Sequence, residues 1–352
     1  MQKIKIDGTD IGKNCPCYTI AEAGANHEGD IKKALNLIDA AKESGVNAIK
    51  FQNYTAAKLT TKTAPKYWDD GIKNESQFDV FDKLDKLSDD EWSQIFDYAR
   101  KKDITCFSTP FDMESVDLLE SLNVPAYKIA SADITHIPLV KKIASKQKPI
   151  FMSTGMASMD EVHDAVSIIQ DEGNEEIIIM HCITSYPTKS EDANLDMIKS
   201  LDLEFPDYII GYSDHTLGTD IASYSIFYGS KCIEKHFTYD KNLSVSRDHR
   251  LSLNSDDFKE LIKKIKLIEM SRGSRARDNF SAESNAVEFA RRSIVSKYDI
   301  PKGTEITENM IDVKRPGTGI LPKYFFKIIG SKTLKDIPED STIQWTDIDF
   351  NQ

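Results

Sequence analysis

The chain has 352 residues, of which 40% are hydrophobic and 29% are charged, and its formal net charge is −12. This composition predicts a globular protein with one large and one small domain, and the negative charge argues against nucleic acid or an anionic membrane surface as a partner. No segment has the roughly 18 apolar residues of a membrane span, no secretory signal is visible, and five cysteines without a framework suggest reduced thiols, so we expect a cytoplasmic protein.

Eight short apolar runs recur along the chain, and each ends in a polar cluster. They begin at Cys17, Asn47, Ile104, Ala126, Pro149, Glu176, Tyr208 and Lys231. Segments of helical period separate them, such as 31–45 and 159–173, and this alternation predicts a parallel sheet. Eight units in about 240 residues are typical of a (β/α)8 TIM barrel. An open doubly wound sheet is the alternative, but no Gly-x-Gly-x-x-Gly follows the first run.

The longest gap lies between the second and third runs. It contains residues 53–84, which are rich in tyrosine, tryptophan and phenylalanine. A long insertion after a barrel strand usually lies over the active mouth. We therefore expect a lid or a subunit-contact element there.

The C-terminal part differs in composition from the rest. A helix is expected to end near Met270 and complete a barrel domain of residues 1–270, followed by a polar linker at 271–286. Residues 287–352 then contain Asp-Ile-Pro twice, starting at Asp299 and Asp336, which indicates a pseudo-repeat in a small β-rich module. A module of roughly 65 residues is near the lower size limit for independent folding, so we expect it to lean on a barrel.

Two histidines end neighbouring strands of the predicted barrel. His215 follows the seventh run and His236 ends the eighth, and the carboxyl ends of barrel strands carry the chemistry in this fold. Two imidazoles together with oxygen ligands suit a divalent ion such as Mn2+, Mg2+ or Co2+, whereas a closed zinc site needs four nitrogen or sulfur ligands. The alternative is that both are hydrogen-bonding core histidines.

Lysines and hydroxyl groups mark the same predicted mouth. Lys50 and Lys128 end two strands, and together with several hydroxyls they predict a cradle for a phosphate or carboxylate. The alternative is that the lysines reach solvent or pair with Glu22 or Glu234. The hydroxyl side chains are Thr109, Ser131, Ser153, Thr184 and Ser213. Candidates for acid–base chemistry are Glu22, Asp133, Glu234 and Asp248, and Lys128 or Lys235 could form a Schiff base.

Several motifs taken together are specific. In chain order they are IAEAGANHEGD, IKFQ, FSTPFD, YKIASAD, STGMAS, HCITSYPT, GYSDHTLG and IEKHF. They resemble the sialic acid synthase family, which includes N-acetylneuraminate, legionaminate and pseudaminate synthases. The tail, including VKRPGTG around Arg315, resembles the SAF (antifreeze-like) domain fused to these enzymes.

The resemblance implies an activity and a set of roles. The enzyme would condense phosphoenolpyruvate with an N-acetylated mannosamine-type aldehyde and release phosphate, without needing a Schiff base. Metal binding would fall to His215 and His236. Phosphoenolpyruvate would be held by Lys50, Thr109, Lys128, Ser131, Ser153, Thr184 and Ser213, and catalysis would involve Glu22, Asp133 and both lysines. The sugar would contact Glu22, Tyr186, Asp248 and an arginine, Arg315, that reaches the barrel from the other subunit of a domain-swapped homodimer.

Three positions depart from the family pattern, one at a catalytic carboxylate and two that concern the acceptor. Asp133 stands where a longer glutamate is usual, and Thr184 stands where neuraminate synthases tend to have asparagine, which favours the legionaminate branch. The loop at 239–250 lacks the usual glycine and proline and adds Arg247, His249 and Arg250. The alternative function is a non-catalytic sugar- or phosphoenolpyruvate-binding barrel whose SAF module serves in interactions.

Overall fold

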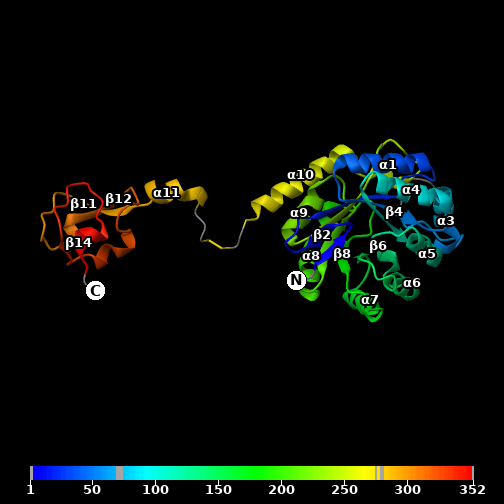
Figure 1. The fold of residues 1–352 in the computed structure, drawn as a ribbon, viewed down its shortest axis with the longest axis horizontal. Helices are drawn as coiled ribbons and strands as arrows, with labels where there is room; N and C mark the ends of the chain where they lie inside the picture. Colours follow the sequence, from blue (N-terminus) through cyan, green and yellow to red (C-terminus); the bar gives the residue numbers. More distant parts are fainter. Residues whose placement is uncertain (1–2, 69–73, 274–275, 278–280, 351–352) are drawn as a thin grey trace. The chain divides into compact units, whose positions relative to one another are not determined.

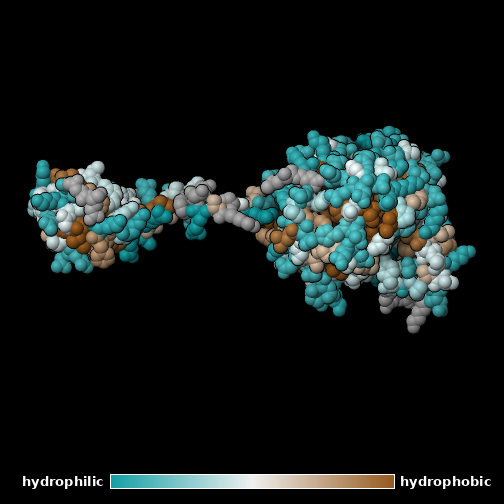
Figure 2. All heavy atoms as spheres, turned by 90° about the horizontal axis from the view of Figure 1, so that it is seen from below, coloured by the Kyte–Doolittle hydropathy of each residue, from teal (hydrophilic) through white to brown (hydrophobic). Residues whose placement is uncertain are grey.

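The computed structural model describes residues 3–68, 74–273, 276–277 and 281–350. The chain divides into two compact units, Met1–Gly273 and Ser274–Gln352 (Figure 1). The surface of both units is mainly hydrophilic, with small hydrophobic patches (Figure 2), as the composition suggests. Among the described residues, no helix combines the length and apolar character that crossing a bilayer requires.

Unit 1 is a closed barrel of eight parallel strands, as the sequence predicts, and not an open sheet (Figure 1). Each strand matches one of the eight apolar runs, and the ring closes where β10 pairs with both β9 and β3. The strands are β3 (Tyr18–Gly24), β4 (Ala48–Asn53), β5 (Thr105–Pro110), β6 (Tyr127–Ile129), β7 (Ile150–Ser153), β8 (Ile177–Cys182), β9 (Ile209–Asp214) and β10 (Cys232–His236). Because the runs are buried on both faces, they are almost continuously apolar.

Helices surround the strands and begin where the local sequence supplies a cap. Capping boxes start three of them, with Ser88, Ser158 and Asn254 as the N-cap residues. The first helix ends at Gly45, whose φ of 78° suits glycine. The barrel helices are α1 (Ile31–Ser44), α4 (Asp89–Lys101), α5 (Met113–Ser121), α6 (Ile137–Ala144), α7 (Met159–Asp171), α8 (Asp196–Glu204), α9 (Asp220–Tyr228) and α10 (Ser255–Ser271).

The insertion after β4 carries two short helices, α2 (Ala56–Leu59) and α3 (Gln77–Leu84). Its aromatic residues pack on one another: the Tyr54 ring lies 5.5 Å from that of Phe81, which also contacts Trp68. Side chains of the insertion line the mouth of the barrel, which is the place expected for a lid. Residues 69–73 of the expected element lie outside the described residues.

An N-terminal hairpin, β1 (Lys3–Ile6) and β2 (Thr9–Gly12), was not expected from the sequence. Its side chains Ile4, Ile6 and Ile11 are fully buried. They form one cluster with residues from the N-terminal halves of the barrel strands, namely Tyr18, Ile20, Ala48, Phe107, Ala126, Phe151, Ile178, Met180, Ile209 and Cys232. The hairpin therefore closes the end of the barrel opposite the carboxyl ends of the strands.

Unit 2 contains the predicted pseudo-repeat. Its elements are α11 (Ser284–Phe289), β11 (Ser293–Ser296), β12 (Ile311–Lys314), β13 (Lys332–Thr333) and β14 (Ile348–Asp349). The two Asp-Ile-Pro copies pair through reciprocal backbone hydrogen bonds between Ile300 and Ile337. Asp299 accepts from the backbone of one copy while Asp336 accepts from the other, each at 2.7 Å. A core of nine isoleucines lies beneath this pairing.

Candidate active site

A cavity of about 610 Å3 opens at the carboxyl ends of the strands, and every barrel strand contributes a side chain to it. The structure brings together all the predicted site residues of unit 1, which are Glu22, Lys50, Thr109, Lys128, Ser131, Asp133, Ser153, Thr184, Tyr186, Ser213, His215, His236 and Asp248. The remaining predicted residue, Arg315, belongs to unit 2.

Two lysine–carboxylate pairs form the floor of the cavity. Lys50 Nζ lies 2.5 Å from Glu22 Oε2 and donates to Thr109 Oγ1 at 2.9 Å. Lys128 Nζ donates to both carboxylate oxygens of Glu234, at 2.8 and 3.0 Å. All four ionisable side chains are at most 6% exposed. The alternative drawn from the sequence, that the lysines pair with these glutamates, is therefore what the structure shows.

The two carboxylates of the floor have different proton affinities. Burial raises the pKa of Glu22 to about 7, and Lys50 only partly offsets it. Burial acts on Glu234 as well, but the charges of Lys128 and Lys50 outweigh it and lower the pKa to about 2. Glu234 is thus a fixed anion, whereas Glu22 can exchange a proton near neutral pH, which is the property that a general acid or base needs.

Hydroxyl groups around the floor include two that lack partners. Ser153 Oγ and Thr184 Oγ1 are buried without a hydrogen bond among the described residues, and a bound polar ligand would supply one. Ser131 Oγ accepts from Gly155 N at 3.0 Å. A Cβ on Gly155 would lie 2.5 Å from Thr184 Oγ1 and 2.9 Å from Ser131 Oγ. Only glycine therefore allows the backbone to come this close to the two hydroxyls.

The rings of His215 and His236 lie 5.3 Å apart, measured between their centroids, and both contact Tyr186. His215 Nδ1 lies 2.8 Å from the Ile183 carbonyl oxygen, which assigns its proton to Nδ1 and leaves the lone pair on Nε2. His236 Nδ1 is buried and has no hydrogen-bond partner in the part of the chain that the structure describes. Burial is the main cause that lowers the pKa of His236 to about 3, so the ring is neutral, as a metal ligand must be.

These two rings fit a divalent ion whose other ligands are not protein histidines or thiolates. Among the described residues, no group of three His, Cys, Asp or Glu side chains is arranged to hold a metal. Oxygen atoms of water or substrate would complete the coordination, as Mn2+ and Mg2+ prefer.

A buried network fixes the backbone beside both histidines. Lys235 Nζ donates to Asp214 Oδ2 and to the Thr216 carbonyl, both at 2.6 Å. Asp214 also accepts from Tyr212 Oη and from the Thr216 amide. Lys235 is 1% exposed and does not line the cavity, so it cannot serve as the Schiff-base lysine considered from the sequence. The network joins the residues that precede His215 and His236.

The loop at 239–250 is held by a carboxylate that sequence reasoning missed. Glu28 Oε1 accepts from the amides of Val245 and Ser246, at 2.9 and 3.2 Å, and lies 3.2 Å from His249 Nε2. His249 is buried and its Nδ1 lies 2.8 Å from Thr238 Oγ1. His249 is thus part of the loop's support, and the sequence signal for Glu28 is its place in the turn that follows β3.

Asp133 ends a 3-10 turn at Ser131–Asp133 on the rim of the cavity. Its Oδ2 is buried without a hydrogen bond among the described residues. Burial raises its pKa to about 6. Asp133 is therefore the second carboxyl group, beside Glu22, that can exchange a proton near neutral pH.

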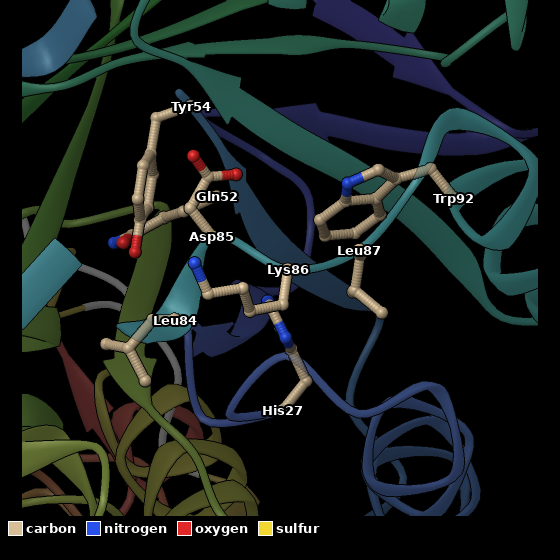
Figure 3. A pocket seen from close by; sticks show the side chains of 8 residues that line it. All are labelled: His27, Gln52, Tyr54, Leu84, Asp85, Lys86, Leu87 and Trp92. Atoms are coloured by element: carbon tan, nitrogen blue, oxygen red, sulfur yellow. The ribbon is translucent and has the colours of Figure 1, made fainter. Parts of the chain in front are cut away.

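A second, small cavity of about 10 Å3 is lined by side chains that include His27, Gln52 and Tyr54 (Figure 3). Gln52 lines both cavities and donates to Glu22 Oε1 at 2.9 Å. His27 Nε2 and Tyr54 Oη lack hydrogen bonds among the described residues, and Figure 3 shows both side chains beside this space. The space suits about one water molecule, which would support Gln52 and, through it, Glu22.

Comparison with known proteins gives matches over most of the chain. Residues 37–277 match the model of the NeuB family, and residues 291–349 match the SAF domain. An uncharacterised protein of Methanocaldococcus jannaschii is 42% identical over 99% of both chains. The N,N'-diacetyllegionaminic acid synthase of Campylobacter jejuni is 37% identical over 92% of this chain and 98% of its own. The crystal structure of an N-acetylneuraminic acid synthetase from Leptospira borgpetersenii, with citrate, is 32% identical, has a TM-score of 0.72 and covers 81% of this chain and 95% of its own.

Proposed function

The chain belongs to the NeuB family and carries a C-terminal SAF domain, and from this we propose that it condenses phosphoenolpyruvate with an N-acetylated mannosamine-type aldehyde. The products are a nine-carbon 2-keto sugar acid and phosphate. The observation that carries the proposal is that one cavity contains two buried lysines, a carboxyl group that titrates near neutrality and two neighbouring histidines, of which His236 is neutral.

Phosphoenolpyruvate binds over the floor of the cavity in this proposal. Lys50 and Lys128 donate to its carboxylate and phosphate, and Thr109, Ser131 and Ser213 complete the cradle. The unpartnered hydroxyls of Ser153 and Thr184 gain hydrogen bonds from the same ligand. Each lysine already has a carboxylate neighbour before the substrate arrives.

His215 and His236 hold a divalent metal in this proposal, and we expect Mn2+, with Mg2+ or Co2+ as substitutes. The ion, when bound, would polarise the aldehyde oxygen and orient the open-chain sugar. Tyr186 packs on both rings and restricts their orientation. The Asp214–Lys235 network lies on the other side of the strands and fixes the backbone next to both histidines.

The chemistry needs two bonds to form and one to break. C3 of the enol attacks the aldehyde carbon and leaves positive charge at C2, which the buried carboxylates stabilise. Water then adds to C2 and gives up a proton to Glu22 or Asp133, whose pKa values of about 7 and about 6 suit this step. That carboxyl group passes the proton on to the alkoxide oxygen of the former aldehyde. The tetrahedral intermediate then breaks the C2–O bond to phosphate, phosphate leaves with the proton of the C2 hydroxyl, and C2 becomes the ketone.

The sugar contacts Glu22, Tyr186 and Asp248 on the barrel in this proposal. Arg315 of the partner subunit completes the site in a domain-swapped homodimer. Support for that last contact comes from the resemblance of the VKRPGTG segment to its family counterpart.

Phosphate release from phosphoenolpyruvate tests the proposal. N-acetylmannosamine, its 6-phosphate and a 2,4-diacetamido-6-deoxy hexose are supplied in turn, with and without a chelator. We expect release with at least one sugar, loss on chelation and recovery with Mn2+, and loss in His215→Ala and His236→Ala with phosphoenolpyruvate still bound. Binding of phosphoenolpyruvate without release for any sugar would favour the non-catalytic binding barrel instead, and activity that survives both histidine changes would refute the metal assignment.

A further inference from the structure

Arg247 joins three segments at the rim of the cavity. Its guanidinium carbon lies 3.5 Å from the ring centroid of Trp68, and 5.6 and 5.5 Å from those of Tyr67 and Tyr186. These rings come from the insertion after β4 and the segment after β8, whereas Arg247 comes from the loop after β10. Stacking on tryptophan fixes the plane of the guanidinium group, so its donors have a defined direction.

One donor of this fixed group has no acceptor. Arg247 Nη1 is buried without a hydrogen bond among the described residues. The side chain as a whole is only 16% exposed, so water has little access to this donor. A guanidinium donor left in this state costs free energy unless a ligand satisfies it. The Arg247 side chain lines the cavity, so that ligand can be a substrate.

Asp248 supplies the complementary atom. Its Oδ1 is also buried without a hydrogen bond and lies 3.4 Å from Arg247 Nε, while its Oδ2 lies 3.8 Å from His236 Nδ1. An unused donor and an unused acceptor therefore stand side by side. A secondary amide offers the matching pair, since its carbonyl oxygen accepts and its N–H donates. The rings of Tyr67 and Tyr186 provide apolar surface for the methyl group of an acetyl.

The charges of the cavity disfavour a phosphate at this place. Asp248 neutralises Arg247 locally, so a dianion would meet no net positive charge. Among the described lining residues, the cations are Lys50, Lys128 and Arg247, and the carboxyl groups are Glu22, Asp133, Glu234 and Asp248. Phosphoenolpyruvate adds further negative charge to this balance. Even with Arg315 of the partner subunit, no cationic side chain is left over for a second phosphate, and the divalent ion of the proposed function would be engaged by the aldehyde oxygen.

We propose that Arg247 and Asp248 bind an acetamido group of the acceptor sugar, with Arg247 Nη1 donating to the amide oxygen and Asp248 Oδ1 accepting from the amide N–H. Arg247 is then a specificity-determining residue that selects an acetamido sugar over the analogue with a hydroxyl group in its place. The inference rests on the proposed function for the identity of the reaction, and on the two unpartnered atoms for the ligand.

The test compares acceptors in the wild type and in Arg247→Gln. Each acetamido sugar is paired with its analogue that has a hydroxyl in place of the acetamido group. We expect Arg247→Gln to lower kcat/KM for the acetamido sugar by about tenfold or more, as loss of a hydrogen bond to a charged group does. The value for the hydroxyl analogue and the KM for phosphoenolpyruvate should not change. The 6-phosphate should be the poorer substrate of the wild type.

The control is Lys241→Gln, which removes one positive charge from the same loop outside the cavity and should leave both sugars unaffected. Equal losses for the two sugars in Arg247→Gln would show a general structural role and overturn the inference, as would preference for the 6-phosphate. Calorimetric binding of the sugar alcohol, in which the aldehyde is reduced, tests the inference separately from the proposed reaction, because binding needs no turnover. Arg247-dependent binding without phosphate release would contradict only the reaction, whereas release without that dependence would contradict only the inference.

Discussion

Replacing Lys235 with methionine removes one partner of a fully buried ion pair. Asp214, whose side chain is not exposed at all, then keeps its hydrogen bonds from Tyr212 and Thr216 but loses its countercharge. Breaking such a pair costs about 3–5 kcal/mol. At roughly 2–4 °C of Tm for each kcal/mol in a domain of this size, thermal denaturation of Lys235→Met should show a decrease of about 10 °C.

A matched control and a second change identify the cause of that decrease. Lys259 forms a surface ion pair with Glu43 at 2.8 Å, and the two side chains are 43% and 70% exposed. Lys259→Met should therefore leave the Tm nearly unchanged. Adding Asp214→Asn to Lys235→Met should recover part of the loss, because the unpaired charge is gone. Equal Tm values for Lys235→Met and Lys259→Met would refute the reasoning.

Three further predictions concern the cavity. Lys128→Met should raise the KM for phosphoenolpyruvate roughly 10- to 100-fold, the value of a hydrogen bond to a charged group, whereas an unchanged KM would remove Lys128 from the cradle. Gly155→Ala should lower kcat/KM about tenfold or more in the same assay, since its Cβ would lie 2.5 Å from Thr184 Oγ1; wild-type activity would contradict this. Burial raises the pKa of Asp133 from 3.8 to about 6, so the native state loses stability as pH rises from about 4 to beyond 6. Asp133→Asn lacks that loss and should gain on the order of 2 kcal/mol over the wild type between pH 4 and pH 8 in denaturant titrations, and a gap independent of pH would contradict the shift.

The barrel was predictable because its strands are buried on both faces, which makes each a short, nearly continuous apolar run. The N-terminal hairpin was not, because its two strands have four residues each and one alternates lysine with isoleucine. That alternation is a weak signal at such a length. Only the packing of Ile4, Ile6 and Ile11 against the barrel interior makes the hairpin stable.

Which side chains of a strand face the cavity was predictable, because successive side chains point to opposite faces of the strand. Glu234 and His236 face the cavity while Lys235 does not, as the period of two requires. The partner of Lys235 was not predictable, because it depends on the register that sets Lys235 opposite Asp214 on β9. The contacts of Glu28 and Arg247 depend on loop conformation, about which residue spacing says nothing.

The hairpin at the closed end of the barrel has a consequence for synthesis on the ribosome. Its apolar side chains leave the exit tunnel before the barrel strands do, yet the surface that covers them includes Cys232 of β10, the last strand of the ring. Until β10 pairs with β3, those isoleucines have no complete cavity to enter. The hairpin is thus made before the barrel strands but is among the last segments to be buried, and the nascent chain exposes it during most of the elongation of the barrel.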